Sequence, residues 1–158
     1  MKSVEKETEK WIEQLRDADE RGLQELEQLL VHKRIVWFRE NNEIVQQLKG
    51  DLLERAYRLL LMKIGIDESD APVIEKTGRR LVFHSRNFCP SLKACIELGL
   101  DTRSVCKNVF EKPADILVKQ LDPSLRFSRN YQSIRPYCDF CEEMISLIGF
   151  PENPSYHK

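Results

Sequence analysis

Apolar residues recur every three or four positions along the first 64 residues, and this spacing predicts amphipathic helices. One stripe covers residues 4–30, with Gly22 as a point where the helix can divide. The apolar cluster within residues 31–40 is ambiguous by itself, and we favour helix because helices are predicted on both sides of it. The strongest pattern covers residues 43–64, and Gly65 is a suitable stop because glycine readily takes the left-handed conformation that ends many helices.

From Ile66 onward the pattern changes to short elements separated by turns. In order, they are a β-hairpin over 72–85 that turns at 76–79, helices over 90–99, 101–110 and 113–121, and strands over 125–131 and 137–147. Pro90 and Asp101 suit helix starts, the first as an initial helical residue and the second as a cap.

These elements predict an α+β fold, in which N-terminal amphipathic helices pack on a small antiparallel sheet of two hairpins with short helices between them. We expect one domain over residues 1–158. It comprises a helical N-terminal layer (1–65), a cysteine-containing α+β part (66–150) and a loose tail (151–158). The apolar stripe of the first helix must pack on the rest of the chain or on a second copy, so a homodimer through the N-terminal helices is one expectation.

Composition narrows the class of protein. Of the 158 residues 41% are hydrophobic and 32% are charged, which is enough apolar material for a real core. No apolar run approaches the length of a membrane span, and the charged N-terminus lacks the apolar segment of a secretion signal. We therefore expect a cytoplasmic protein whose five cysteines are thiols, metal ligands or redox groups rather than structural disulfides.

The net charge of −1 conceals a basic segment. Residues 76–135 contain twelve Lys and Arg but five Asp and Glu, and most of the cysteines lie in or beside this segment. A basic, thiol-rich segment suits a small anionic ligand. The alternative is a solvated surface whose charges pair with the acidic ends of the chain.

The cysteines allow three interpretations. In the first, the pair Cys138-x2-Cys141 and two or three further cysteines bind zinc or an iron–sulfur cluster. Side chains three apart on a strand point to opposite faces, so this site needs a bulge or turn at Asp139.

In the second interpretation, Cys89 is a nucleophile, because it precedes Pro90 at a helix N-terminus, where the helix dipole favours a thiolate. Its base is not obvious, since His84 lies on the preceding strand. In the third, the cysteines are buried core residues, and this is our interpretation for Cys95.

Three arginines punctuate the strand over 125–131 and the segment after it. Alternate residues of a strand share a face, so Leu125, Phe127 and Arg129 line one side and Arg126 the other. An inward arginine beside a cysteine can bind a carboxylate through two hydrogen bonds. For Arg126 the alternative is a surface ion pair with Glu142 or Glu143. Nucleic acid is not an expected partner, because no RNA-binding signature accompanies these residues.

Five short motifs occur in a fixed order. They are Cys89-Pro90, Gly99-Leu100, Cys106, Pro123 with Leu125 to Arg129, and Cys138-Asp139-Phe140. In this order and spacing the region over residues 85–142 resembles the L-2-amino-thiazoline-4-carboxylate hydrolase family. The chain departs from that pattern in the additional Cys95 and Cys141 and in the acidic residues that follow Cys141.

The resemblance implies hydrolytic opening of a small cyclic amidine carboxylate. It implies Cys89 as nucleophile or ligand, Cys106 and Cys138 as ligands or supports, Asp139 as the group that orients water or a ligand, and Arg129 as the anchor of the substrate carboxylate. With Cys141 added, the same cysteines become a four-thiolate zinc or iron–sulfur site. The leading hypothesis is thus a cysteine-lined site for a small anionic ligand, with hydrolysis of a C–N bond as its reaction. The alternative is a non-enzymatic metal-binding or ligand-sensing module.

Overall fold

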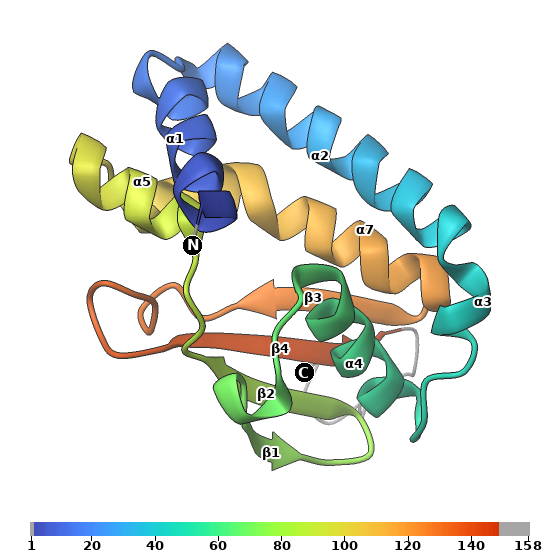
Figure 1. The fold of residues 1–158 in the computed structure, drawn as a ribbon. Coiled ribbons are helices and arrows are strands. Elements are labelled where there is room, and N and C mark those ends of the chain that lie inside the picture. The colour runs from blue at the N-terminus through green and yellow to red at the C-terminus, as the bar shows by residue number, and fades with distance from the viewer. Residues whose placement is uncertain (1, 149–158) are drawn as a thin grey trace, which may run out of the picture.

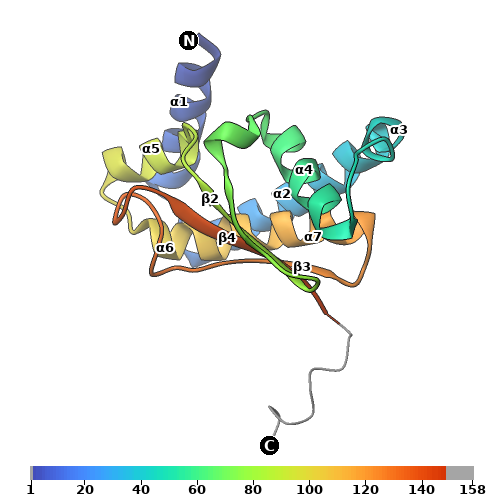
Figure 2. The ribbon, with the colours of Figure 1, turned by 90° about the horizontal axis from the view of Figure 1, so that it is seen from below.

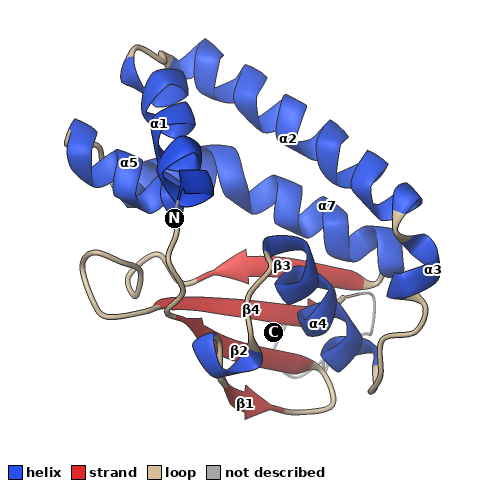
Figure 3. Ribbon diagram, viewed as in Figure 1, coloured by secondary structure: helices blue, strands red, loops and turns tan. Residues whose placement is uncertain are grey.

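A computed structural model describes residues 2–148 of the chain. Four strands form one antiparallel sheet in the order β1-β2-β4-β3, and helices pack against it (Figures 1 and 3). Both hairpins of the sheet are local in sequence, and the helices between them connect β2 to β3. The predicted α+β fold is therefore confirmed. The tail expected to be loose, 151–158, lies outside the described residues.

The N-terminal region forms two helices, α1 (Lys2–Arg16) and α2 (Glu20–Glu40). They divide just before Asp19, not at Gly22 as predicted. The Asp19 side chain accepts the backbone N–H of Gly22 at 2.8 Å and so caps the start of α2. Gly22 lies inside the first turn of that helix, because a capping carboxylate decides a helix start more strongly than one exposed glycine does.

The single helix predicted over 43–64 is wrong. The structure has a short α3 (Asn42–Val45) and a longer α4 (Leu52–Ile64), separated by a loop. Gly50 has φ +105°, which L side chains rarely adopt, and Asp51 follows it as the cap of α4. Apolar periodicity continues across this break, so the periodicity alone did not reveal it. Gly65, with φ +82°, ends α4 as predicted.

The strands form two hairpins, which are joined because β2 pairs with β4. β1 (Val73–Lys76) and β2 (Arg80–Ser85) enclose the predicted turn, in which Thr77 Oγ1 accepts two backbone N–H groups. A short 3₁₀ turn, η1 (Glu68–Asp70), precedes them. β3 (Leu125–Arg129) pairs with β4 (Cys141–Leu147), and β4 also pairs with β2 to join the hairpins.

β4 begins four residues later than the predicted strand over 137–147. The backbone N–H groups of Tyr137 and Cys138 both bond to the carbonyl of Ile134, at 3.0 and 3.2 Å, and so close a local turn. Those groups are then not available to a sheet ladder. Cys138 consequently lies in a turn, and only Cys141 lies in the strand.

Helices connect the two hairpins. They are α5 (Pro90–Leu98), α6 (Thr102–Val105), the π-helical η2 (Cys106–Phe110) and α7 (Glu111–Leu121). Pro90 begins α5 and Asp101 caps α6, as predicted. Pro113 does not open a helix but is the third residue of α7, directly after the π-helical turn. Proline has no backbone N–H to donate, so it interrupts the regular hydrogen bonds of a helix. A π-helical turn is one way in which a helix accommodates such an interruption.

Buried side chains form two clusters. The sheet cluster lies between α4, α7 and the sheet, and it includes Leu59, Phe83 and Phe127. α4 and α7 lie on the same face of the sheet (Figure 2). The helical cluster lies between α1, α2, α5 and η2, and it includes Trp11 and Val109.

α1 packs on α5 of the same chain, and its Trp11 and Leu15 are buried there. Much of the predicted apolar stripe is therefore covered internally, and pairing with a second copy stays a prediction. Within residues 2–148, no helix combines the length and apolar character needed to cross a lipid bilayer.

Candidate functional site

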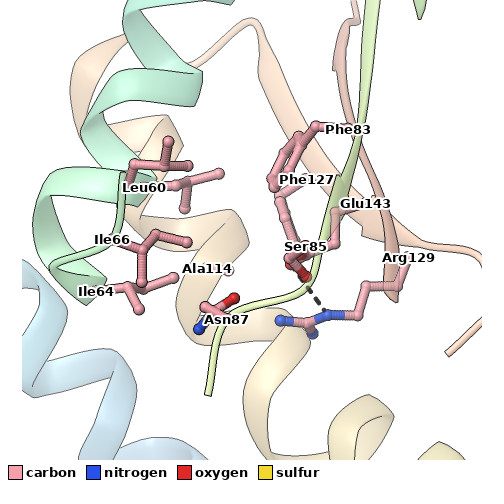
Figure 4. A pocket seen from close by; sticks show the side chains of 11 residues that line it. Leu60, Ile64, Ile66, Phe83, Ser85, Asn87, Ala114, Phe127, Arg129 and Glu143 are labelled. Carbon is pink, nitrogen blue, oxygen red and sulfur yellow. Dashed lines mark ion pairs between the residues drawn. The ribbon is translucent and has the colours of Figure 1, made fainter. Parts of the chain in front are cut away.

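A small cavity of about 40 Å³ lies between α4 and the sheet, at the end of the sheet where β2 leads toward α5 (Figure 4). One wall is aliphatic and comes from α4 and the segment after it. The opposite side includes polar groups from β2, β3 and β4. The lining residues are Leu60, Leu61, Ile64, Ile66, Phe83, Ser85, Asn87, Ala114, Phe127, Arg129 and Glu143.

Arg129 and Glu143 form a largely buried ion pair at the polar end of this cavity. They face each other across β3 and β4 in the ladder, and Arg129 Nε lies 3.4 Å from Glu143 Oε1. Only 15% of the Arg129 side chain and 10% of the Glu143 side chain are exposed. Burial alone would lower the pKa of Arg129, but the charge of Glu143 and other neighbours raises it above its ordinary value. Arg129 is therefore a permanent cation in this site.

One nitrogen of Arg129 has no hydrogen-bond partner. Among the described residues, Nη1 of Arg129 is the buried side-chain nitrogen or oxygen that no acceptor satisfies. The guanidinium extends from the Glu143 side of the site toward Asn87 (Figure 4). A buried donor without an acceptor costs about 1–3 kcal/mol, and more for a charged group. An acceptor from a bound molecule would remove this cost.

Cys106 and Tyr131 lie beside the guanidinium. Burial raises the pKa of Cys106 to about 12, and the charge of Arg129 only partly offsets this effect. The Tyr131 hydroxyl donates to Glu111 Oε1 at 2.7 Å, and burial raises the pKa of Tyr131 as well. Both groups are therefore protonated at neutral pH; the Tyr131 proton is donated to Glu111, and the Cys106 thiol retains a weak donor.

The structure brings several of the predicted cysteines toward Cys106. Besides burial, electrostatic interaction with Cys89, Cys141 and Cys95 contributes to the raised pKa of Cys106, so these thiols belong to the same region of the fold. Cys89 lies at the N-terminus of α5, as predicted, and its Sγ contacts Ser91 Oγ at 3.1 Å rather than a backbone N–H of the helix. Cys95 is fully buried in α5, in agreement with a core role.

The remaining predicted residues lie in or after the loop between β3 and β4. Cys138 Sγ donates to the carbonyl of Phe140 at 3.0 Å, whereas Asp139 is exposed. Cys141 Sγ accepts from Arg135, from the backbone N at 3.4 Å and from Nε at 3.3 Å. Arg135 also donates through Nη1 to the carbonyl of Asn87, and it thereby ties the segment before α5 to β4.

A metal site does not assemble from these residues. Among residues 2–148, no three His, Cys, Asp or Glu side chains lie together in an arrangement that could hold a metal ion. The predicted ligands Cys89, Cys106, Cys138 and Cys141 are instead engaged with separate partners or buried as thiols.

His84 and Arg126, the remaining candidate residues, do not line the cavity. His84 Nε2 lies 3.0 Å from Glu142 Oε1, and its ring stacks on Phe140 at 3.8 Å. The described contacts of His84 and of Cys89 thus do not join them as base and nucleophile. Arg126 is exposed, as predicted for its face, but the ion pair across the hairpin is made by Arg129.

Sequence reasoning missed two parts of the site. Glu143 was considered only as a surface partner of Arg126, and the aliphatic wall from α4 was not connected to the strands at all. The alternation that placed Arg129 on the inner face also applies to Glu143, Ile145 and Leu147, so the partner could have been found by aligning the hairpin.

The chain matches no known family model, no curated protein and no solved structure. The resemblance to the thiazoline-carboxylate hydrolases therefore stays a prediction from motifs.

Proposed function

We propose that this protein binds a small carboxylate at the cavity between α4 and the sheet, with Arg129 as the anchor of the carboxylate. The observation that carries the proposal is the buried Nη1 of Arg129, which has no acceptor among the described residues. Guanidinium and carboxylate match in geometry, because two parallel N–H groups can meet two oxygens.

The size of the cavity limits the rest of the ligand. A space of about 40 Å³ corresponds to roughly three water-sized groups. Its wall is largely aliphatic and aromatic, from side chains such as Leu60, Ile66 and Phe127. A short aliphatic chain or the edge of a five-membered ring fits this volume and this chemistry.

Glu143 narrows the ligand further. Its charge offsets that of Arg129, so the pair together is close to neutral. A ligand that presents only a negative charge would repel Glu143, whereas a ligand with N–H groups beside its carboxylate can use both partners. A carboxylate that also bears an amidine, amide or amine group therefore suits the pair best. The cyclic amidine carboxylates implied by the sequence motifs belong to this class.

Hydrolysis of the bound molecule is a second step of the proposal. It would need a nucleophilic thiol, and Cys106 is a poor candidate because its pKa of about 12 keeps it protonated. Cys89 is the better candidate, since it occupies the N-cap position of α5, where the free backbone N–H groups of the helix favour an anion. Binding and hydrolysis are separable: Cys89→Ser should abolish ring opening and leave ligand binding intact.

Calorimetric titration with a panel of small carboxylates tests the binding step. The panel contains short aliphatic acids, their 2-amino derivatives and cyclic amidine carboxylates. Arg129→Lys keeps the positive charge opposite Glu143 but removes the planar fork, and we expect it to weaken binding on the order of tenfold or more. Arg126→Lys is the matched control on the opposite face of β3 and should bind normally.

Two results would overturn the proposal. One is the absence of binding by every member of the panel to the unaltered protein. The other is equal affinity in Arg129→Lys and Arg126→Lys. Release of a ring-opened product, followed by NMR on the same samples, would decide the hydrolytic step separately.

A further inference from the structure

Asn87 lines the same cavity as Arg129 and lies near the end of its guanidinium (Figure 4). It belongs to the segment that leads from β2 to α5, and it is half-buried. Nη1 of Arg129 has no hydrogen-bond partner among the described residues, so the amide oxygen of Asn87 is too far away to accept from it directly. The two polar groups therefore face one cavity without bonding to each other, and a bound molecule can bridge them.

The side-chain amide of Asn87 has a defined orientation. Its Nδ2 donates to the backbone carbonyl of Phe88 at 3.0 Å. A reversed amide would bring two acceptors together at this position, which is unfavourable. The hydrogen bonds recorded for Asn87 within residues 2–148 use Nδ2 and the backbone carbonyl, so Oδ1 is the acceptor left for a ligand. In Figure 4 this oxygen is on the side of the amide that faces Arg129.

Arg135 holds the backbone of Asn87 in place. Its Nη1 donates to the carbonyl of Asn87, and its Nε donates to Cys141 Sγ at 3.3 Å. The backbone of Arg135 is fixed in turn, because its N–H donates to the same sulfur at 3.4 Å and its carbonyl accepts from the buried Thr102 hydroxyl at 2.9 Å. Arg135 thereby joins Asn87 to β4 and to α6.

The segment around Asn87 has little other support. Phe88, the next residue, is 54% exposed, so packing does not fix the chain there. On the other side, the N–H of Arg86 bonds to the carbonyl of Asp70 at 2.7 Å, but the Arg86 side chain is exposed. A segment with few buried contacts shifts more readily than a packed helix or strand. Loss of the Arg135 side chain should therefore displace Asn87 without unfolding the protein.

We propose that Asn87 selects ligands that carry an N–H group beside the carboxylate, and that Arg135 is the positioning residue that holds Asn87 for this contact. This assignment rests on the proposed function, because it takes Arg129 as the anchor of the carboxylate. An amine, amide or amidine N–H next to that carboxylate donates to Oδ1 of Asn87. A ligand with a methylene group at the same place leaves this acceptor without a donor, so the site binds it less tightly.

Matched pairs of ligands measure this selection. Free proline and cyclopentanecarboxylate differ at one position of a five-membered ring, and 2-aminobutanoate and butanoate differ by one amino group. Calorimetric titration of the full chain gives the ratio of affinities within each pair. We expect the unaltered protein to favour the N–H-bearing member by about tenfold. Asn87→Leu should reduce this ratio by about fivefold and leave the affinity for the other member within about twofold of normal.

Variants of Arg135 test the positioning role. Arg135→Met should reduce the ratio as Asn87→Leu does, and Arg135→Lys should restore most of it, because lysine keeps one donor for the carbonyl of Asn87. Arg86→Met is the matched control, since it removes an exposed arginine next to Asn87 that does not line the cavity. It should leave the ratio unchanged. A general loss of structure would weaken both members of a pair equally, so the ratio separates positioning from a merely structural effect.

The outcomes distinguish this proposal from the one on which it rests. A ratio that Asn87→Leu leaves unchanged, while binding still requires Arg129, would overturn the role of Asn87 alone. A normal ratio in Arg135→Met, or a ratio reduced equally in Arg86→Met, would overturn the role of Arg135. Failure of all four acids to bind the unaltered protein would overturn the proposed function and this inference together. If Asn87→Leu does not fold, the smaller change Asn87→Ala provides the same comparison.

Discussion

Removal of the Arg129 side chain should destabilise the protein mainly through Glu143. The two charges lie 3.4 Å apart, and with an effective dielectric constant of about 20 their attraction is about 5 kcal/mol before desolvation is subtracted. Breaking a buried pair from one side leaves the other charge without a partner, which typically costs about 3–5 kcal/mol. Because Arg129 is 15% exposed, we expect Arg129→Met to lower the free energy of unfolding by about 3 kcal/mol.

The double variant Arg129→Met/Glu143→Leu separates the charge from the packing. Once both charges are gone, no buried ion remains, so its stability should return to within about 1 kcal/mol of the unaltered protein. The two single variants and the double variant complete a cycle, and the coupling energy should be about 2 kcal/mol or more.

Urea unfolding of all four proteins measures these quantities, followed by far-ultraviolet circular dichroism and tryptophan fluorescence. Arg126→Met is the control on the exposed face of β3, and it should change stability by less than about 0.5 kcal/mol. Additive single variants, with a coupling energy below about 0.5 kcal/mol, would refute the view that Arg129 and Glu143 depend on each other.

Three further predictions concern other parts of the chain. The hydrogen bond from Lys76 and the capping hydrogen bonds lower the pKa of Asp51. Its contribution to stability is therefore present above the unfolded pKa of about 4 and is lost as the pH falls. Urea unfolding at pH 5 and pH 3 should show a smaller loss of stability between the two pH values in Asp51→Asn than in the unaltered protein. Burial raises the pKa of Cys106 to about 12, so above about pH 9 the folded state keeps a proton that the unfolded state has lost. The free energy of unfolding should therefore fall across about pH 9–12, and less steeply in Cys106→Ala than in the unaltered protein. Equal slopes in the two proteins would contradict the raised pKa of Cys106. At neutral pH, mass spectrometry should find Cys106 alkylated more slowly by iodoacetamide in folded than in urea-unfolded protein. Gly65→Ala places a side chain at φ +82°, and since nothing lies within 4 Å of the added carbon, the cost is conformational only, about 1 kcal/mol in urea unfolding; no change in stability would argue against the left-handed cap.

Local signals in the chain predicted most of the elements. Pro90, Gly65 and Asp101 mark helix ends where the structure has them, because each acts on the backbone within one turn. The wrong predictions concerned places where a helix-start signal was overlooked. Asp19 and the Gly50 to Asp51 pair start new helices within continuous apolar periodicity, and periodicity reports the buried face rather than the path of the backbone.

The candidate site could be predicted only in part. Period-two alternation placed Arg129 on the inner face of β3, and the structure agrees. The prediction for Cys138 depended on a strand that the turn at Ile134 shortens, and Asp139 lies exposed directly after that turn. No spacing rule indicates which of five thiols will approach one another when they come from separate elements.

The sequence by itself determined that this chain folds as α+β, because strand alternation, helical periodicity and caps act between residues close together in the chain. Tertiary structure alone decided which charges meet. Arg129 encounters Glu143 and the aliphatic wall of α4, because the sheet cluster packs these distant segments together. The energy of a charge depends on its burial and on its neighbours, and both are properties of the folded chain.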